Sequence, residues 1–214
     1  MSHGRSGSVW RCGLTGSSAT RLGGDLGFPF GLQRDVGGRV LVSESWRHRI
    51  VALAAEGAGR PEVIVADLPA YPARIAPRSD GGFLLALFAP RNQLVEFILQ
   101  EDGYRRAMMV EVDPAAWVAP MLASERALAA PLQAGAVRQM GVLKPWAPSL
   151  SCGLVVACDV GMRPCASWHS RTDGSRHGVT SVCEHGGRVL VAARDAGTLM
   201  ALDGWTMPNR PGVA

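Results

Sequence analysis

The sequence predicts an all-β fold in which a unit of four short strands repeats, and two landmarks support this prediction. The hexapeptide GGRVLV occurs at Gly37–Val42 and again at Gly186–Val191, and the related GGFLLA stands at Gly81–Ala86. The other landmark, Asp-Leu followed by an aromatic residue and a proline, occurs at Asp25–Pro29 and Asp67–Pro72. Both landmarks first recur after 43 or 44 residues. A period of about 40–50 residues with four short strands is typical of the blade of a β-propeller.

Each Gly-Gly pair predicts a tight turn that leads into a strand. Glycine tolerates the positive φ that such turns need, and the apolar run after it suits a strand covered on both faces. Within one period we expect strands at 30–33, 39–44, 49–54 and 62–66. The next period opens with strands at 73–76 and 82–88. The start of the chain matches only the third and fourth strands of an earlier blade, at 8–14 and 17–22. The remaining strands are expected at 153–159, 165–170, 179–184, 188–193 and 198–203.

A mostly helical insertion is expected inside the second full unit. Gly81 and Gly186 are 105 residues apart, about 61 more than one period. The excess falls at 92–150, where helices are expected at 93–99 and 115–132, interrupted by prolines. The insertion carries an apolar stripe that either packs on the blades or forms a lid or a membrane-skimming surface: Trp117, Met121, Leu122 and Trp146. The chain thus divides into a partial propeller, 1–203, and a Pro/Gly-rich tail, 204–214.

Composition limits the classes of partner. The net charge of +4 comes from arginines spread along the chain, with Lys144 the only lysine, which disfavours nucleic-acid binding. The five cysteines form no C-x-x-C pair, so we expect mostly buried, free thiols and a reducing compartment such as the cytoplasm. No apolar run reaches the roughly 20 residues of a transmembrane helix, and the first residues lack the apolar region of a signal peptide. We therefore expect a soluble protein.

Five motifs resemble those of strictosidine-synthase-like proteins. Ser43–Ile50 resembles the E-T-x-R-x-R-I stretch of that family. Leu68–Pro72, Asp80–Phe83 and Ala89–Asn92 resemble its L-P-G-Y-P, D-G-G-F and S-P-R-N motifs. Val179–Gly187 is similar to its V-T-S-V-x-E-H-D-G motif, and the order of the motifs agrees. The resemblance implies a partial six-bladed β-propeller of about three blades, corresponding to the C-terminal portion of the family.

The resemblance also implies chemistry in the central channel. The family includes enzymes that condense an amine with an aldehyde, and it is related to calcium-dependent lactonases and arylesterases, the gluconolactonase-like and paraoxonase-like propellers. In those hydrolases Asn, Asp and Glu side chains from the innermost strands hold a metal ion. Such hard oxygen ligands suit calcium, and the ion polarises an ester carbonyl.

This sequence departs from the family at the channel positions. Phe30 stands where the hydrolases carry a ligand Asn, and Ala73 and Arg74 stand where they carry Asp-Asn. An apolar ring and a guanidinium offer no lone pair to a cation, so we expect no calcium, no other cofactor and no metal site. Thr180 occupies the position of the catalytic Glu of the condensing enzymes. Because Thr does no general acid–base work near neutral pH, strictosidine synthesis is not expected.

Two residues near the channel have alternative roles. Arg74 is expected either to receive a carboxylate or a phosphate as an anion clamp, or to extend to solvent at the channel mouth. His177 precedes an innermost strand and is a weak candidate for a catalytic base, the alternative being a solvated loop residue.

The part of the family resemblance that is richest in charged residues contains Glu44, Arg47 and Arg49. We expect these residues to form an ion-pair network between blades, with contact to a substrate as the alternative. His48 and His185 lie among charged or turn residues and are expected at the surface.

Three functional hypotheses follow from these residues. The first is a propeller that hydrolyses a small organic ester or lactone, provided that further blades complete the site. The second is a non-catalytic propeller that binds a small organic molecule or a protein, and the third is a truncated fragment of a longer protein. An open arc of blades exposes sheet edges, so we expect the missing blades to come from a longer chain or from self-association.

Overall fold

The computed structural model describes residues 4–16, 18–57, 59–122, 138–140, 142–143, 151–170, 176–194 and 197–202. Two four-stranded antiparallel sheets form its centre, and both keep the chain order of their strands. The first contains β3 (Pro29–Arg34), β4 (Val40–Glu44), β5 (Arg49–Leu53) and β6 (Glu62–Val65). The second contains β7 (Ala70–Pro77), β8 (Phe83–Pro90), β11 (Leu154–Cys158) and β12 (Pro164–His169).

Two smaller sheets flank this centre. At the N-terminal side β1 (Gly7–Cys12) pairs with β2 (Ala19–Leu26). At the C-terminal side a three-stranded sheet, the last sheet, contains β13 (Val179–His185), β14 (Arg188–Ala193) and β15 (Thr198–Leu202). The strand positions agree with those expected from the repeat to within a few residues. The tail at 204–214 lies outside the described residues.

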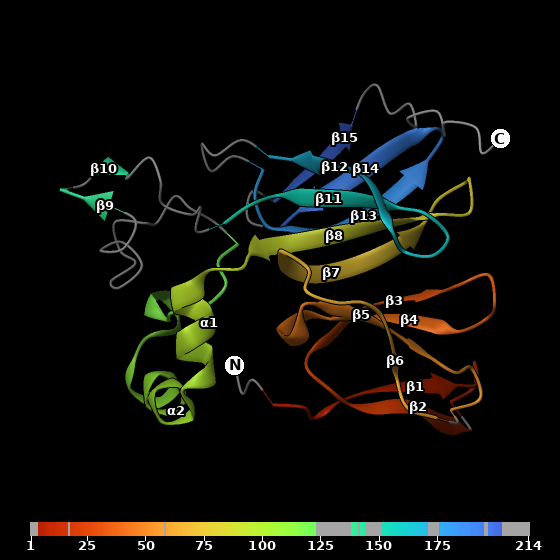
Figure 1. Ribbon diagram of the computed structural model, residues 1–214, viewed down its shortest axis with the longest axis horizontal. Helices are drawn as coiled ribbons and strands as arrows, with labels where there is room; N and C mark the ends of the chain where they lie inside the picture. The colour runs from red at the N-terminus through yellow and green to blue at the C-terminus, as the bar shows by residue number, and fades with distance from the viewer. Residues whose placement is uncertain are drawn as a thin grey trace.

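The sheets follow one another as the blades of a propeller do. Figure 1 shows them in chain order, from β1–β2 at the bottom through β3–β6 to the sheets of β8 and β14 at the top. The first strand of each larger sheet is the innermost one, and β7 contacts both β3 and β13. The chain is therefore all-β with a partial propeller architecture, as the repeat predicts.

The glycine pairs form the turns expected of them. Gly38, Gly81, Gly186 and Gly187 all have positive φ, between 57° and 88°. At these positions a residue with a side chain would be strained. Each turn connects the two strands of an antiparallel pair and sets their register: β3 with β4, β7 with β8, and β13 with β14.

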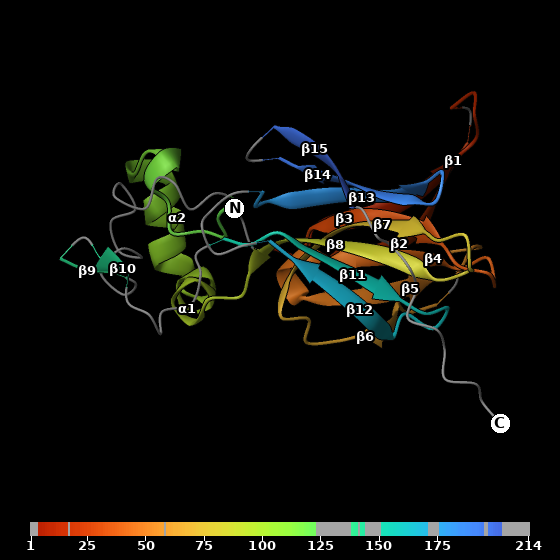
Figure 2. The same cartoon turned by 90° about the horizontal axis from the view of Figure 1, so that it is seen from above.

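The insertion leaves the second four-stranded sheet after β8 and returns at β11, which pairs directly with β8. It begins with α1 (Gln93–Gln100) and α2 (Asp102–Glu111), followed by the short 3-10 helix η2 (Pro114–Ala116). Both views show α1 and α2 at one end of the blades (Figure 2). A two-stranded sheet of β9 (Arg138–Gln139) and β10 (Val142–Leu143) also belongs to it.

The prediction of a helix at 115–132 is wrong for the residues of that range that the structure describes, 115–122. Only the η2 turn is helical there, because Pro114 and Pro120 interrupt the backbone hydrogen bonding. The helix α2 was not expected, because its buried residues include Arg105 beside Met108 and so give no apolar stripe. The Arg105 guanidinium is satisfied by the Leu99 carbonyl and by Asp102.

The apolar stripe of the insertion packs partly on the blades. Leu122 packs against the core of β7, β8, β11 and the last sheet, whereas Trp117 packs against the buried face of α1 and α2. Trp46, which lies in the 3-10 helix η1 (Ser45–Arg47), contacts both clusters. Trp146 lies outside the described residues.

Buried hydroxyl groups join the first four-stranded sheet to the innermost strand of the second. Ser43 Oγ accepts a hydrogen bond from the Gly31 N–H at 2.7 Å and donates to the Ala73 carbonyl. Ser45 Oγ donates to the Pro72 carbonyl. A Cβ on Gly31 would lie 2.4 Å from the Ala73 oxygen, so only glycine permits this approach of β3 to β7.

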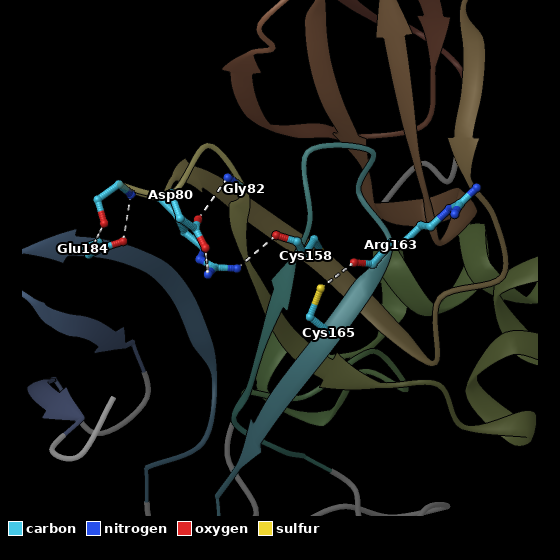
Figure 3. A network of polar contacts seen from close by, with 8 residues as sticks. Asp80, Gly82, Cys158, Arg163, Cys165 and Glu184 are labelled. Atoms are coloured by element: carbon cyan, nitrogen blue, oxygen red, sulfur yellow. Dashed lines mark hydrogen bonds and ion pairs between the residues drawn. The ribbon is translucent and has the colours of Figure 1, made fainter. Parts of the chain in front are cut away.

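A second set of polar contacts joins the blades at the end away from the helices, around the β7–β8 turn (Figure 3). Ser79 donates from its backbone N–H and from its hydroxyl to the Glu184 carboxylate of β13. Arg78, which is buried, donates to the Cys158 carbonyl of β11 and forms an ion pair with Asp80. The Ser79 contacts join the turn to the last sheet, and the Arg78 contact with Cys158 fastens it to β11 of its own sheet.

Candidate functional site

The four predicted channel residues lie on the innermost strands. Phe30 belongs to β3, Ala73 and Arg74 belong to β7, and Thr180 belongs to β13. Ala73 is fully buried and Thr180 is 9% exposed, whereas Arg74 is exposed and Phe30 is partly exposed. Of these four residues, only Phe30 and Arg74 therefore present substantial surface.

Arg74 extends over the ring of Phe30. The guanidinium carbon lies 5.9 Å from the ring centroid, within the range of a cation–π contact. Arg74 makes no ion pair with any described residue. Its positive charge is thus held over an aromatic face and has no neutralising carboxylate within the described part of the chain.

Aromatic rings continue from Phe30 toward the end of the blades that carries the helices. Phe30 stacks on Phe88 at 6.0 Å and meets Phe28 edge-on at 5.4 Å. Phe28 is 42% exposed and also contacts Trp46. This arrangement offers a partly exposed aromatic surface beside a cation, which suits a ligand with an apolar body and a negative charge.

Glu44 forms ion pairs with both of its expected partners. Its side chain is fully buried, and its two oxygens face Arg47 at 3.4 Å and Arg49 at 2.5 Å. The Gly27 N–H also donates to the carboxylate at 2.7 Å. The network ties the β4–β5 connection to the entrance of β3 within one sheet, not to the next blade.

A second polar cluster was missed by the sequence reasoning. His48, expected at the surface, is only 5% exposed; its ring lies 4.4 Å from that of Tyr71, and its Nε2 lies 3.0 Å from a Glu96 carboxylate oxygen. Tyr71 is fully buried on β7 and donates its hydroxyl to the other Glu96 oxygen. Glu96 lies in α1, so the cluster fastens the insertion across the interface between the two four-stranded sheets.

The environment perturbs both titratable partners of His48. Burial, followed by the hydrogen bond to Glu96 and its charge, raises the pKa of Tyr71. Burial alone would raise the pKa of Glu96, but hydrogen bonds from His48 and Tyr71 and the charges of His48 and Arg91 lower it below its ordinary value. A carboxylate facing a neutral phenol is the arrangement that results.

One signal in the sequence was available for this cluster. Tyr71 precedes Pro72 in a motif shared with the resembling family, and a buried tyrosine needs a hydrogen-bond partner. Nothing in the sequence indicated that the partner would be Glu96, 25 residues further along the chain. The contact between Glu96 of α1 and Tyr71 of β7 is a property of the tertiary structure.

His177 is not the solvated loop residue that was the alternative to a catalytic base. It is 1% exposed, and its Nδ1 lies 2.5 Å from the hydroxyl oxygen of Ser151, which is itself fully buried. The pair resembles a nucleophile and its base in residue type, but burial leaves no room for a reacting molecule. Its evident effect is to fix the chain between the insertion and β13.

The cysteines divide into two classes, contrary to the expectation of mostly buried thiols. All five are free; Cys12, Cys165 and Cys183 are exposed. Burial raises the pKa of Cys152 to about 11 and that of Cys158 to about 12. These two thiols, one partly buried and one buried, are therefore protonated and unreactive near neutral pH.

The described ranges contain neither a metal-binding cluster nor a membrane-spanning helix. No three His, Cys, Asp or Glu side chains come together there in a way that could hold a metal ion. Neither described helix has the length and hydrophobicity needed to span a membrane.

No family model and no curated protein matches this sequence. A solved structure that matches is a calcium-binding protein, regucalcin, from Agrobacterium tumefaciens: the TM-score is 0.52 at 13% identity. The match covers 94% of this chain and 54% of regucalcin, so the chain spans about half the length of that propeller.

A catalytically inactive virginiamycin B lyase from Staphylococcus aureus, solved with quinupristin, is more distant. Its TM-score is 0.40 at 10% identity, over 91% of this chain and 62% of the lyase. At such identities the regucalcin match establishes the propeller fold alone. The resemblance to strictosidine-synthase-like proteins stays a prediction from the motifs.

Proposed function

We propose that this chain belongs to a propeller that binds a small organic anion at the centre of its blades, with Arg74 as the receiving group. The observation that carries the proposal is the exposed Arg74 guanidinium, held over Phe30 on an innermost strand and without an ion-pair partner among the described residues. Arginine binds carboxylates and phosphates in a planar, two-point geometry.

The residues beside Arg74 favour binding over metal-assisted hydrolysis. Phe30 and Ala73 carry no oxygen or nitrogen ligand, and Thr180 offers only a hydroxyl. A cation held near Arg74 would also meet a fixed positive charge. The aromatic surface of Phe28 and Phe30 adds apolar contact for the body of the ligand.

The proposal is tested with phenyl phosphate and phenylacetate as probes. We expect saturable binding by calorimetry and a loss of at least tenfold in affinity in Arg74→Ala, with partial retention in Arg74→Lys because the charge is kept. Arg34→Ala is the matched control, since Arg34 is an exposed arginine at the other end of β3. Affinity unchanged in Arg74→Ala would exclude the anion site.

A small-molecule ester or lactone hydrolase is the second candidate, favoured by the motifs that resemble the lactonase-related family. It requires chemistry that Arg74 alone does not supply. Assays with aryl acetates and lactones, with and without calcium, separate the two candidates: calcium-dependent turnover supports the hydrolase, and binding without turnover supports the first proposal.

We also propose that further blades, from a longer chain or a second copy, cover the outer face of the last sheet. That face carries Leu190, Leu199 and Ala201, of which Leu199 is 71% exposed. If a second copy of this chain covers the face, we expect a dimer in solution, and we expect Leu199→Lys to weaken that dimer. A monomeric mass for this chain would leave the longer chain as the source.

A further inference from the structure

A cleft separates the second four-stranded sheet from the last sheet. Its volume is about 390 Å³, within the range of small-molecule sites. Val155 and Trp168 line one side, and Val191, Met200 and Leu202 line the other. Trp168, Met200 and Leu202 are only partly buried and pack against the core that both sheets share. The cleft is therefore an apolar slot between two rigid sheets, open toward their outer strands.

One end of the cleft is polar. His169 and Arg176 line it there, and the described lining residues include no Asp or Glu. Arg176 makes no ion pair with any described residue. The His169 ring nitrogen Nε2 lies 3.1 Å from the Ser167 hydroxyl, so that ring is held against its own strand. The described part of the mouth therefore carries the positive charge of Arg176.

The backbone that presents Arg176 is firmly anchored. The next residue, His177, is buried against Ser151, and the Gly178 N–H donates to the Cys152 carbonyl at 2.9 Å. A Cβ on Gly153 would lie 2.3 Å from the Arg176 carbonyl oxygen, so glycine is needed where this segment crosses the start of β11. These contacts hold Arg176 at the mouth of the cleft.

We infer that this cleft is a second binding site, for a flat aromatic monoanion. The aromatic body lies between Trp168 and Met200, and the carboxylate faces Arg176. Aromatic stacking and a charge-assisted hydrogen bond are the interactions that these side chains supply. The site is separate from Arg74 and does not depend on the function proposed above.

The test uses 2-naphthoate and its neutral analogue 2-naphthamide as probes, with the whole chain labelled with ¹⁵N. The indole N–H resonance of Trp168, identified by its loss in Trp168→Phe, reports binding. We expect 2-naphthoate to shift this resonance saturably and at least fivefold more tightly than 2-naphthamide. Arg176→Gln removes that preference, so both probes then bind with the affinity of the amide.

Two leucines of β15 supply a matched pair of variants. Leu202 lines the cleft and Leu199 lies on the opposite face of the same strand, so Leu202→Trp abolishes binding and Leu199→Trp does not. If Leu202→Trp fails to fold, Leu202→Phe replaces it as the test, because this smaller change is expected to lower the affinity of the cleft for 2-naphthoate. The inference is overturned if Arg176→Gln leaves the preference for naphthoate intact, if both leucine variants behave alike, or if Arg74→Ala abolishes the Trp168 shift.

Discussion

The two copies of GGRVLV have the same sequence but different surroundings. In the first copy, Leu41 packs toward the second four-stranded sheet and Val42 packs toward β1–β2, so both faces of β4 are buried. In the second copy, Val189 and Val191 are buried, whereas Leu190 on the other face is partly exposed and belongs to no core cluster. The hexapeptide thus encodes the turn and the strand, and the neighbouring sheets decide how much of it is buried.

The interface between the two four-stranded sheets and the interface with the last sheet differ in the same way. Where β4 meets β7, Ser43, Ser45 and Gly31 bring two backbones into direct contact. Where the second four-stranded sheet meets the last one, the polar contacts lie at the β7–β8 turn and a cleft remains toward the outer strands. A closed interface stabilises the arc, and an open one leaves room for a ligand.

The largest effect is expected from matched truncations in the two hexapeptides. Leu41→Ala leaves a cavity in a buried core and lowers the free energy of unfolding by about 3 kcal/mol. Leu190→Ala lowers it by about 1 kcal/mol or less, because part of that side chain is already in contact with solvent. Urea denaturation of both variants checks the difference. Equal losses would show that the face of Leu190 is covered in solution.

A smaller effect is expected from the serines that join the blades. Ser43→Ala leaves the Gly31 N–H and the Ala73 carbonyl without their partner in a buried interface, so we expect a loss of about 2 kcal/mol. Ser79→Ala removes an exposed contact with Glu184 and costs less than about 1 kcal/mol. The same denaturation experiment compares them, and a larger loss in Ser79→Ala would contradict the ranking of the two interfaces.

The smallest effect concerns the pH response of Tyr71 at the closed interface. Its pKa is raised, so the stability contributed by the neutral phenol is complete below about pH 10, the ordinary tyrosine pKa, and is lost only as the pH rises beyond it. In Tyr104→Phe, Tyr71 is the only tyrosine. We therefore expect little tyrosinate absorbance at 295 nm near pH 10.5 while the protein stays folded.

Glu96→Gln in the same background is the control for that titration. It removes the charge that disfavours the tyrosinate but leaves Tyr71 buried, so the absorbance appears at a lower pH than in the parent. Full ionisation of Tyr71 near pH 10 in the folded parent would contradict the position of Tyr71 against Glu96.

Several features were predictable because they depend on neighbours in sequence. The repeat of glycine turns and apolar runs predicted the strands, and the excess length between Gly81 and Gly186 predicted the insertion. The inner-strand positions of Phe30, Ala73, Arg74 and Thr180 followed from the period. The burial of His48 and His177 did not follow, because the groups that cover them, Tyr71, Glu96 and Ser151, are between 23 and 48 residues away.

By itself, the sequence determined the strands, their turns and the order of the sheets, since glycine geometry and alternating or continuous apolar runs act over a few residues. Only the tertiary structure decided which faces are covered, that Glu96 of α1 meets Tyr71 of β7, and that Arg176 stands at the mouth of an apolar cleft. The physical reason is that burial and electrostatics depend on which surfaces meet. The two identical hexapeptides of this chain contact different surfaces and are therefore buried to different extents.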